Sequence, residues 1–136
     1  MRSAQRGLVR LGYAADAAGR GIVYARIGSE SPRVLRAAFR ASPGAEHEPR
    51  DVGFAAVRAI APALRKQIGE MQLQLDDAGL IADLTQRREL PNGLLIPYVR
   101  ARCALNSFKC CELVQSDGPN DLAARARAEV SLRLAA

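Results

Sequence analysis

Residues 71–81 of this 136-residue chain read MQLQLDDAGLI and change their periodicity in the middle. The first five residues alternate between apolar and polar side chains, which is typical of a half-buried β-strand. Two consecutive aspartates, Asp76 and Asp77, follow the strand, and the apolar residues Leu80 and Ile81 then continue in a pattern that fits a helix. The stretch therefore predicts a strand that ends in acidic residues and leads directly into a helix.

The chain before this stretch predicts three short strands and one long helix. The strands are residues 8–16, 22–27 and 33–40. Because only brief turns separate them, we expect an antiparallel meander. Apolar residues then recur at helical spacing over residues 52–64, with Pro49 near the start of the helix and Pro62 inside it. We expect Pro62 to kink this helix or to end its regular part, and the strand that follows the helix to run parallel to the first strand.

The chain after residue 81 continues the alternation of helices and strands. The predicted elements are short helices over residues 78–88 and 94–106, a strand over 108–115 and an alanine-rich helix over 120–134. Asn120 is placed to cap the last helix. Since no linker or repeat interrupts the chain, we predict a single domain over residues 1–136.

Composition narrows the class of protein. The chain is 49% hydrophobic and 25% charged, which is ordinary globular composition, and no apolar run reaches the roughly 18 to 20 residues of a membrane helix. We therefore expect a cytoplasmic protein that does not enter a membrane. Lysine and arginine total 20 against 14 acidic residues, a net charge of +6, which favours polyanionic partners, although many basic proteins bind no nucleic acid.

The cysteines predict no metal centre and no disulfide framework. Cys103, Cys110 and Cys111 are an odd number, and the one histidine, His47, lies far from them in the sequence. We expect buried or half-buried structural thiols.

The order of elements, with acidic residues after the first and fourth strands, resembles the ribonuclease H-like superfamily over nearly the whole chain. Asp16 is similar to the aspartate that ends the family's first strand, and Asp77 to the acid that follows the fourth strand. Residues 119–126 resemble the start of the family's closing helix. The resemblance implies an α/β fold with a five-stranded mixed sheet, in which a three-strand antiparallel meander joins two parallel strands and helices flank the sheet.

The resemblance also implies a chemistry. Ribonucleases H cut the RNA strand of an RNA/DNA hybrid with two divalent ions, magnesium or manganese, about 3.5 to 4 Å apart. Asp16 and Asp77 would be the catalytic residues and metal ligands, and their carboxylates would then lie within roughly 4 to 6 Å of each other. The ordinary alternative is that Asp16 starts a turn and Asp77 or Asp76 caps the next helix.

This sequence departs from the family at two acidic positions. Val52 stands where the first helix of the family carries a glutamate, and Ala124 stands where the closing helix carries an aspartate. Asp51, Asp121 and Asp76 are possible auxiliary acids, although acids in the first turn of a helix usually serve the helix itself. We therefore predict a ribonuclease H-like nucleic-acid-binding protein with weak or lost catalysis, the alternative being an active metal-dependent endonuclease.

Arginines provide the predicted contacts to phosphates. The residues that we expect to contact nucleic acid are Arg20, Arg87, Arg88 and Arg125. The alternative is that they form solvated helix faces. A protein partner is the second kind of partner that a non-catalytic relative of this fold would bind.

Overall fold

The computed structural model describes residues 7–28, 32–41, 49–86, 92–116 and 118–135. Its strands are β1 (Gly7–Ala15), β2 (Arg20–Ile27), β3 (Arg33–Arg40), β4 (Glu70–Leu75) and β5 (Cys110–Gln115). They form one sheet in the order β3-β2-β1-β4-β5. β2 is antiparallel to both β1 and β3, whereas β4 is parallel to both β1 and β5. This is the mixed five-stranded sheet predicted from the sequence.

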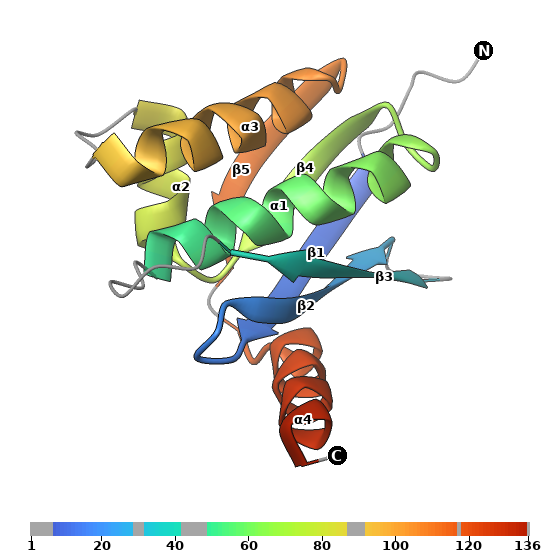
Figure 1. Ribbon diagram of the computed structural model, residues 1–136. Coiled ribbons are helices and arrows are strands. Elements are labelled where there is room, and N and C mark those ends of the chain that lie inside the picture. Colours follow the sequence, from blue (N-terminus) through green and yellow to red (C-terminus); the bar gives the residue numbers. More distant parts are fainter. Residues whose placement is uncertain (1–6, 29–31, 42–48, 87–91, 117, 136) are drawn as a thin grey trace.

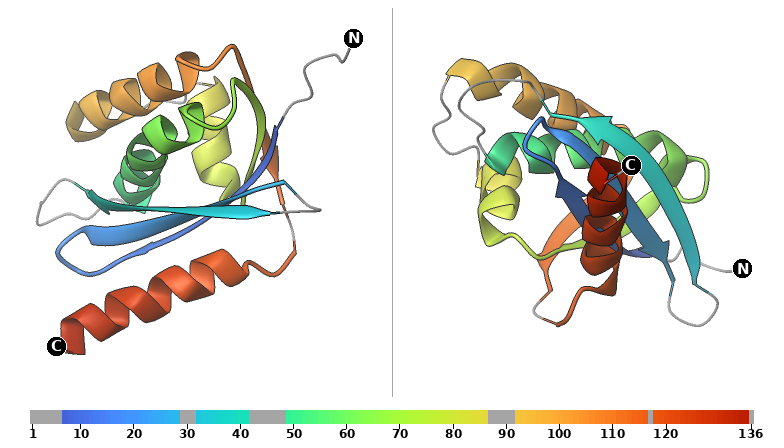
Figure 2. Two further views of the ribbon diagram at one scale, coloured as in Figure 1. Left: turned by 90° about the vertical axis from the view of Figure 1, so that its right-hand side faces the viewer. Right: turned by 60° about the horizontal axis from the view of Figure 1, so that its bottom comes forward.

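Helices cover both faces of the sheet (Figure 1; Figure 2). The helices are α1 (Pro49–Arg65), α2 (Ala78–Gln86), α3 (Leu95–Asn106) and α4 (Asp121–Ala135), with a short 3-10 turn η1 (Asn92–Leu94) before α3. α1, α2 and α3 lie on one face, and α4 lies alone on the other. The predicted continuation of α2 to residue 88 lies outside the described residues.

Each face of the sheet has its own apolar core. The larger core joins the sheet to α1 and contains fully buried side chains such as Phe54, Ile60 and Leu73. The smaller core lies under α4, where Leu122, Ala126 and Val130 recur every four residues. That spacing places the three side chains on one helical stripe, which packs on the sheet.

α4 comes unusually close to β1 at Gly12. A Cβ atom at this position would lie 2.2 Å from the backbone nitrogen of Ala123 and 2.6 Å from the Cβ of Leu122. Only glycine leaves enough room for the helix here. The start of α4 is thereby held against the middle of β1.

Two expectations from the sequence need correction. α1 continues past Pro62 to Arg65, so this proline does not end the helix. Cys110 and Cys111 are partly buried, but Cys103 is exposed, because its position on α3 faces away from the core. No helix in the described part of the chain combines the length and apolar character that crossing a membrane would require.

Candidate nucleic-acid interface at the carboxyl edge of the sheet

The carboxyl ends of β1 and β4 form the edge at which the sequence predicted a site. The parallel register pairs Gly7 with Met71 and Arg10 with Gln74. β4 ends one residue later, at Leu75, and Asp76 and Asp77 follow it. Ligands of open α/β sheets usually bind at this kind of edge.

Asp77 caps α2. Its Oδ1 accepts hydrogen bonds from the backbone N–H groups of Gly79, at 2.8 Å, and Leu80, at 3.3 Å. These two groups would otherwise lack a partner inside the helix. The capping role that the sequence offered as an alternative is therefore present, and it occupies one carboxylate oxygen of Asp77.

Asp76 is neutralised by neighbours from β1 and from the start of α4. Its Oδ1 lies 2.8 Å from the guanidinium of Arg10, and its Oδ2 accepts a 2.7 Å hydrogen bond from the side-chain amide of Asn120. The same amide donates to the Leu11 carbonyl at 2.8 Å, while Asn120 Oδ1 accepts from the N–H of Ala123 at 3.1 Å. Asn120 therefore caps α4, as predicted, and also joins three elements at this edge.

Tyr13 is the β1 side chain whose ionisation responds to the two aspartates. Burial raises the pKa of its phenol, and the charges of Asp77 and then Asp76 raise that pKa further. A Cβ built on Gly53 of α1 would lie 3.2 Å from the Tyr13 hydroxyl, so this hydroxyl lies against α1. A half-buried phenol on β1 thus lies against α1 and senses the charges at the acidic end of β4.

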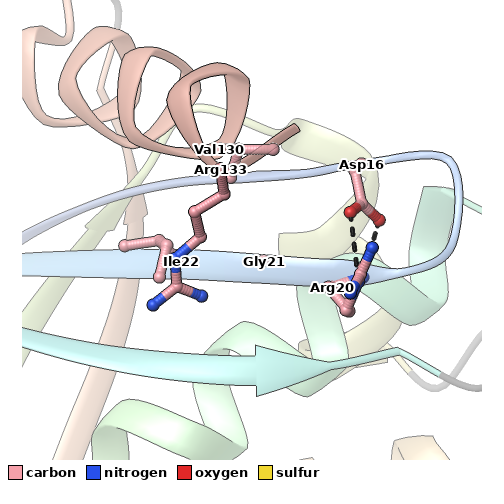
Figure 3. Close-up of a pocket in the computed structure, with 6 residues that line it drawn as sticks. All are labelled: Asp16, Arg20, Gly21, Ile22, Val130 and Arg133. Carbon is pink, nitrogen blue, oxygen red and sulfur yellow. Dashed lines mark hydrogen bonds and ion pairs between the residues drawn. The ribbon is translucent and has the colours of Figure 1, made fainter. Parts of the chain in front are cut away.

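Asp16 starts the turn between β1 and β2. Its Oδ1 accepts hydrogen bonds from the backbone N–H groups of Ala18, at 2.9 Å, and Arg20, at 3.0 Å, and its Oδ2 lies 3.3 Å from Nε of Arg20 (Figure 3). Some desolvation opposes the shift, but these bonds and the Arg20 charge lower the pKa of the Asp16 carboxyl. A cavity of about 70 Å³ beside Asp16 is closed on the α4 side by Val130 and Arg133.

The strand register bears on the expected approach of Asp16 to Asp77. The last pair of the register is Arg10 with Gln74, and continuing it by three residues would place Asp77 level with residue 13, three positions before Asp16. At about 3.3 Å per residue, three positions correspond to about 10 Å along the strand. The close approach of the two carboxylates stays a prediction, and the register favours Tyr13 as the neighbour of Asp77.

The auxiliary acids have their own surroundings. Asp51, in the first turn of α1, is only 5% exposed and lines a small cavity with Arg58 and Arg100. Asp121 forms an ion pair with Arg26, at 2.5 Å, and this partner lowers the pKa of the Asp121 carboxyl. Ala124, which we predicted to replace a family aspartate, is exposed on α4, and Asn120 at the start of this helix reaches Asp76.

The donors at this edge do not fit a pair of divalent ions. Two such ions need several carboxylate oxygens to offset their mutual repulsion. Asp76 already faces the Arg10 cation, Asp77 caps a helix, and Val52 packs against the core. Within the described ranges, no group of three or more His, Cys, Asp or Glu side chains is arranged to hold a metal ion.

The predicted phosphate contacts differ in their exposure. The Arg20 side chain is 62% exposed despite its ion pair with Asp16. The guanidinium of Arg125 lies 4.5 Å from the centre of the Tyr24 ring, in a cation–π contact. Arg87 and Arg88 lie outside the described residues.

Sequence reasoning missed Arg10 and Tyr13. Both lie in β1, where the alternation of side chains predicted only a strand. An arginine inside a largely buried strand is unusual enough to signal a buried partner. The identity of that partner, Asp76, depends on a contact across 66 positions of the chain.

The same fold occurs in solved ribonucleases H. Ribonuclease H1 from the halophilic archaeon Halobacterium salinarum NRC-1 is similar with a TM-score of 0.63 and 18% identity, over 95% of this chain and 99% of that one. The N-terminal ribonuclease H domain of a Mycobacterium tuberculosis protein has a TM-score of 0.63 and 14% identity, over 96% and 99% of the two chains. LC11-RNase H1, solved in complex with an RNA/DNA hybrid, has a TM-score of 0.64 and 12% identity, over 96% and 100%.

These similarities define the fold as ribonuclease H-like. The sequence matches no protein-family model and no curated protein. At such low identities the likeness extends to the fold alone, so function has to be argued from the residues at the edge of the sheet.

Proposed function

We propose that this chain is a ribonuclease H-like nucleic-acid-binding protein whose hydrolytic activity is weak or lost. The observation that carries the proposal is the state of Asp76, which is engaged by Arg10 and Asn120 at the edge where a metal-dependent nuclease needs free carboxylates. The half-buried phenol of Tyr13, whose pKa is raised by burial and then by the charges of Asp77 and Asp76, is a poor ligand for hard cations in its neutral form.

The net charge of +6 supports nucleic acid as the partner, because a basic surface attracts phosphates. One solved protein of the same fold carries an RNA/DNA hybrid, which makes a hybrid or duplex the first ligand to test. We propose Arg20 and Arg125, together with Arg87 and Arg88, as the phosphate contacts. A cytoplasmic location accords with this role and stays a prediction.

Binding is tested by fluorescence anisotropy with a labelled RNA/DNA hybrid over a range of salt concentrations. We expect weak binding whose affinity falls steeply as the salt concentration rises. In a plot of the logarithm of affinity against the logarithm of salt concentration, Arg20→Glu should make the slope shallower by roughly the amount of one phosphate contact. Arg127→Glu is the matched control, because Arg127 is an exposed arginine on α4 outside the proposed contact set. Absence of binding at low salt would exclude the nucleic-acid proposal.

Catalysis is tested with the same hybrid in magnesium and in manganese. We expect the wild type to cut the hybrid very slowly or not at all. The combined change Val52→Glu with Ala124→Asp should raise the activity only if these two positions face the carboxyl edge of the sheet. Asn120→Asp is a second variant that adds a carboxylate at this edge, since Asn120 contacts Asp76 directly. Rapid metal-dependent cleavage by the wild type that Asp16→Asn or Asp77→Asn abolishes would establish the alternative, an active endonuclease with these two aspartates as ligands.

A further inference from the structure

α1 and α3 lie side by side on the face opposite α4 (Figure 2). Their side chains line a groove. The groove has a volume of about 680 Å³, and its walls include Arg58, Pro62 and Arg65 from α1 and Val99 and Cys103 from α3. From residue 99 to residue 107 the α3 wall is about 12 Å long at 1.5 Å per residue. The groove can therefore hold about two turns of another helix.

The α3 side of the groove continues into an exposed apolar stripe. Ile96 is 63% exposed and Val99 is 46% exposed. These two residues and Cys103 follow the helical spacing i, i+3 and i+7, so they lie along one face of α3. Leu95, which is 49% exposed, widens the stripe at its beginning. Contiguous exposed apolar surface of this kind usually marks a site of interaction.

Four cations surround this apolar surface. Arg58, Arg65, Lys66 and Arg100 line the groove, and none of the other described residues that line it is acidic. None of the four forms an ion pair with an acid in the part of the chain that the structure describes. Asp51 is buried and lines an adjoining small cavity with Arg58 and Arg100. The groove thus has an apolar floor and a positive rim whose four cations form no ion pair with a described acid.

We propose that this groove binds an acidic amphipathic helix of a partner protein. Apolar side chains at i, i+3 or i+4 and i+7 of that helix would cover Ile96 and Val99, and flanking glutamates or aspartates would face Arg65 and Arg100. A second copy of this chain fits poorly, because it would bring a further +6 of charge to a positive rim. Nucleic acid would leave the aliphatic stripe unused, and among the residues that the structure describes no aromatic side chain lines the groove for base stacking.

The test uses the full chain and a designed, fluorescein-labelled peptide of about 14 residues with leucines on one helical face and glutamates beside them. A scrambled peptide of the same composition keeps the charge but loses the apolar face. In anisotropy titrations we expect the amphipathic peptide to bind about tenfold more tightly than the scrambled one. Saturating peptide should also slow alkylation of the exposed Cys103, followed by peptide mass mapping.

Variants locate the binding site. Val99→Asp and Arg65→Glu should each weaken binding of the peptide by about tenfold. Val99→Asp places a negative charge against the apolar face of the peptide, and Arg65→Glu places one against its acidic side chains. Leu132→Asp and Arg127→Glu make matched changes on the exposed side of α4 and should leave the affinity unchanged. Thermal melting of each variant checks that the fold is retained.

Three results would overturn the proposal. The first is equal affinity for the amphipathic and scrambled peptides, or no binding of either. The second is unchanged alkylation of Cys103 in saturating peptide. The third is displacement of the peptide by an RNA/DNA hybrid whose own binding is weakened by Arg65→Glu but not by Val99→Asp. That result would assign the groove to nucleic acid.

Discussion

The two helical faces of the sheet use arginine in opposite ways. On the face covered by α4, Arg10, Arg26 and Arg36 are paired with Asp76, Asp121 and Glu129, respectively. In the groove between α1 and α3, the cations form no ion pair with a described acid. The difference separates two roles of charge: on the α4 face it fixes a helix to the sheet, and in the groove it is available to a partner.

The same comparison bears on the candidate nucleic-acid interface. Asp76 belongs to the paired side, since its partners Arg10 and Asn120 lie on β1 and at the start of α4. A carboxylate engaged in this way stabilises the fold and is less available for a metal ion. The predictions below start with the α4 face, where we expect the largest effects.

The strongest effect should follow from Gly12→Val. The added side chain would overlap the backbone of α4, where even a Cβ lies 2.2 Å from the Ala123 nitrogen. We expect a loss of about 3 kcal/mol in the free energy of unfolding, measured by urea denaturation. Gly69→Val is the control, because a Cβ there meets no atom within 4 Å, and an equal loss in both variants would contradict the proposed close approach.

Asp76→Ala should have the next largest effect. It removes the partner of Arg10, whose side chain is only 12% exposed and whose Nη1 is buried without a hydrogen-bond partner within the described residues. We expect a loss of about 2 kcal/mol, because a largely buried cation is left uncompensated. The double variant Asp76→Ala with Arg10→Met should recover part of the lost free energy of unfolding. If the single variant is as stable as the wild type, Asp76 does not hold the edge together.

Glu129 should make the stability of the α4 face depend on pH. The hydrogen bond from Arg36, followed by that from Tyr24, lowers the pKa of this carboxyl from 4.5 to about 2. Its stabilising effect is therefore complete above pH 4.5 and is lost as the pH falls towards 2. Melting temperatures of the wild type and Glu129→Gln should differ above pH 4.5 and converge below it, and a constant difference would contradict the ion pair.

The smallest effect is expected in the groove. Arg65→Ala should change the free energy of unfolding by less than about 0.5 kcal/mol, because no ion pair with a described acid is lost. A loss comparable to that of Asp76→Ala, again measured by urea denaturation, would show that the groove cations stabilise the fold. It would also remove the contrast between the two faces.

The sequence predicted the elements well because their periodicities are local. The alternation in residues 71–75 and the helical spacing in residues 52–64 each report which face of one element is buried. Asn120 also behaved as predicted, since a helix cap depends on a few neighbouring residues. Pro62 does not end α1, because packing on the sheet and on α3 supports this helix through its last turn.

The surroundings of the acids were harder to predict, because they depend on register between distant segments. A shift of a few residues between β1 and β4 decides whether Tyr13 or Asp16 lies level with Asp77. The pairing of Arg10 with Asp76 depends on the same register. The apolar residues of α3 look the same in sequence whether they face the core, as Tyr98 does, or solvent, as Val99 does.

The guanidinium beside Asp76 is covalently attached to β1. Its charge is therefore present at a fixed one-to-one stoichiometry, whatever the ionic composition around the protein. A carboxylate that relies on a dissolved counter-ion gains and loses its charge balance as that ion is supplied or withdrawn. The Asp76 carboxylate therefore has a counter-charge within the chain and does not require a dissolved cation to supply one.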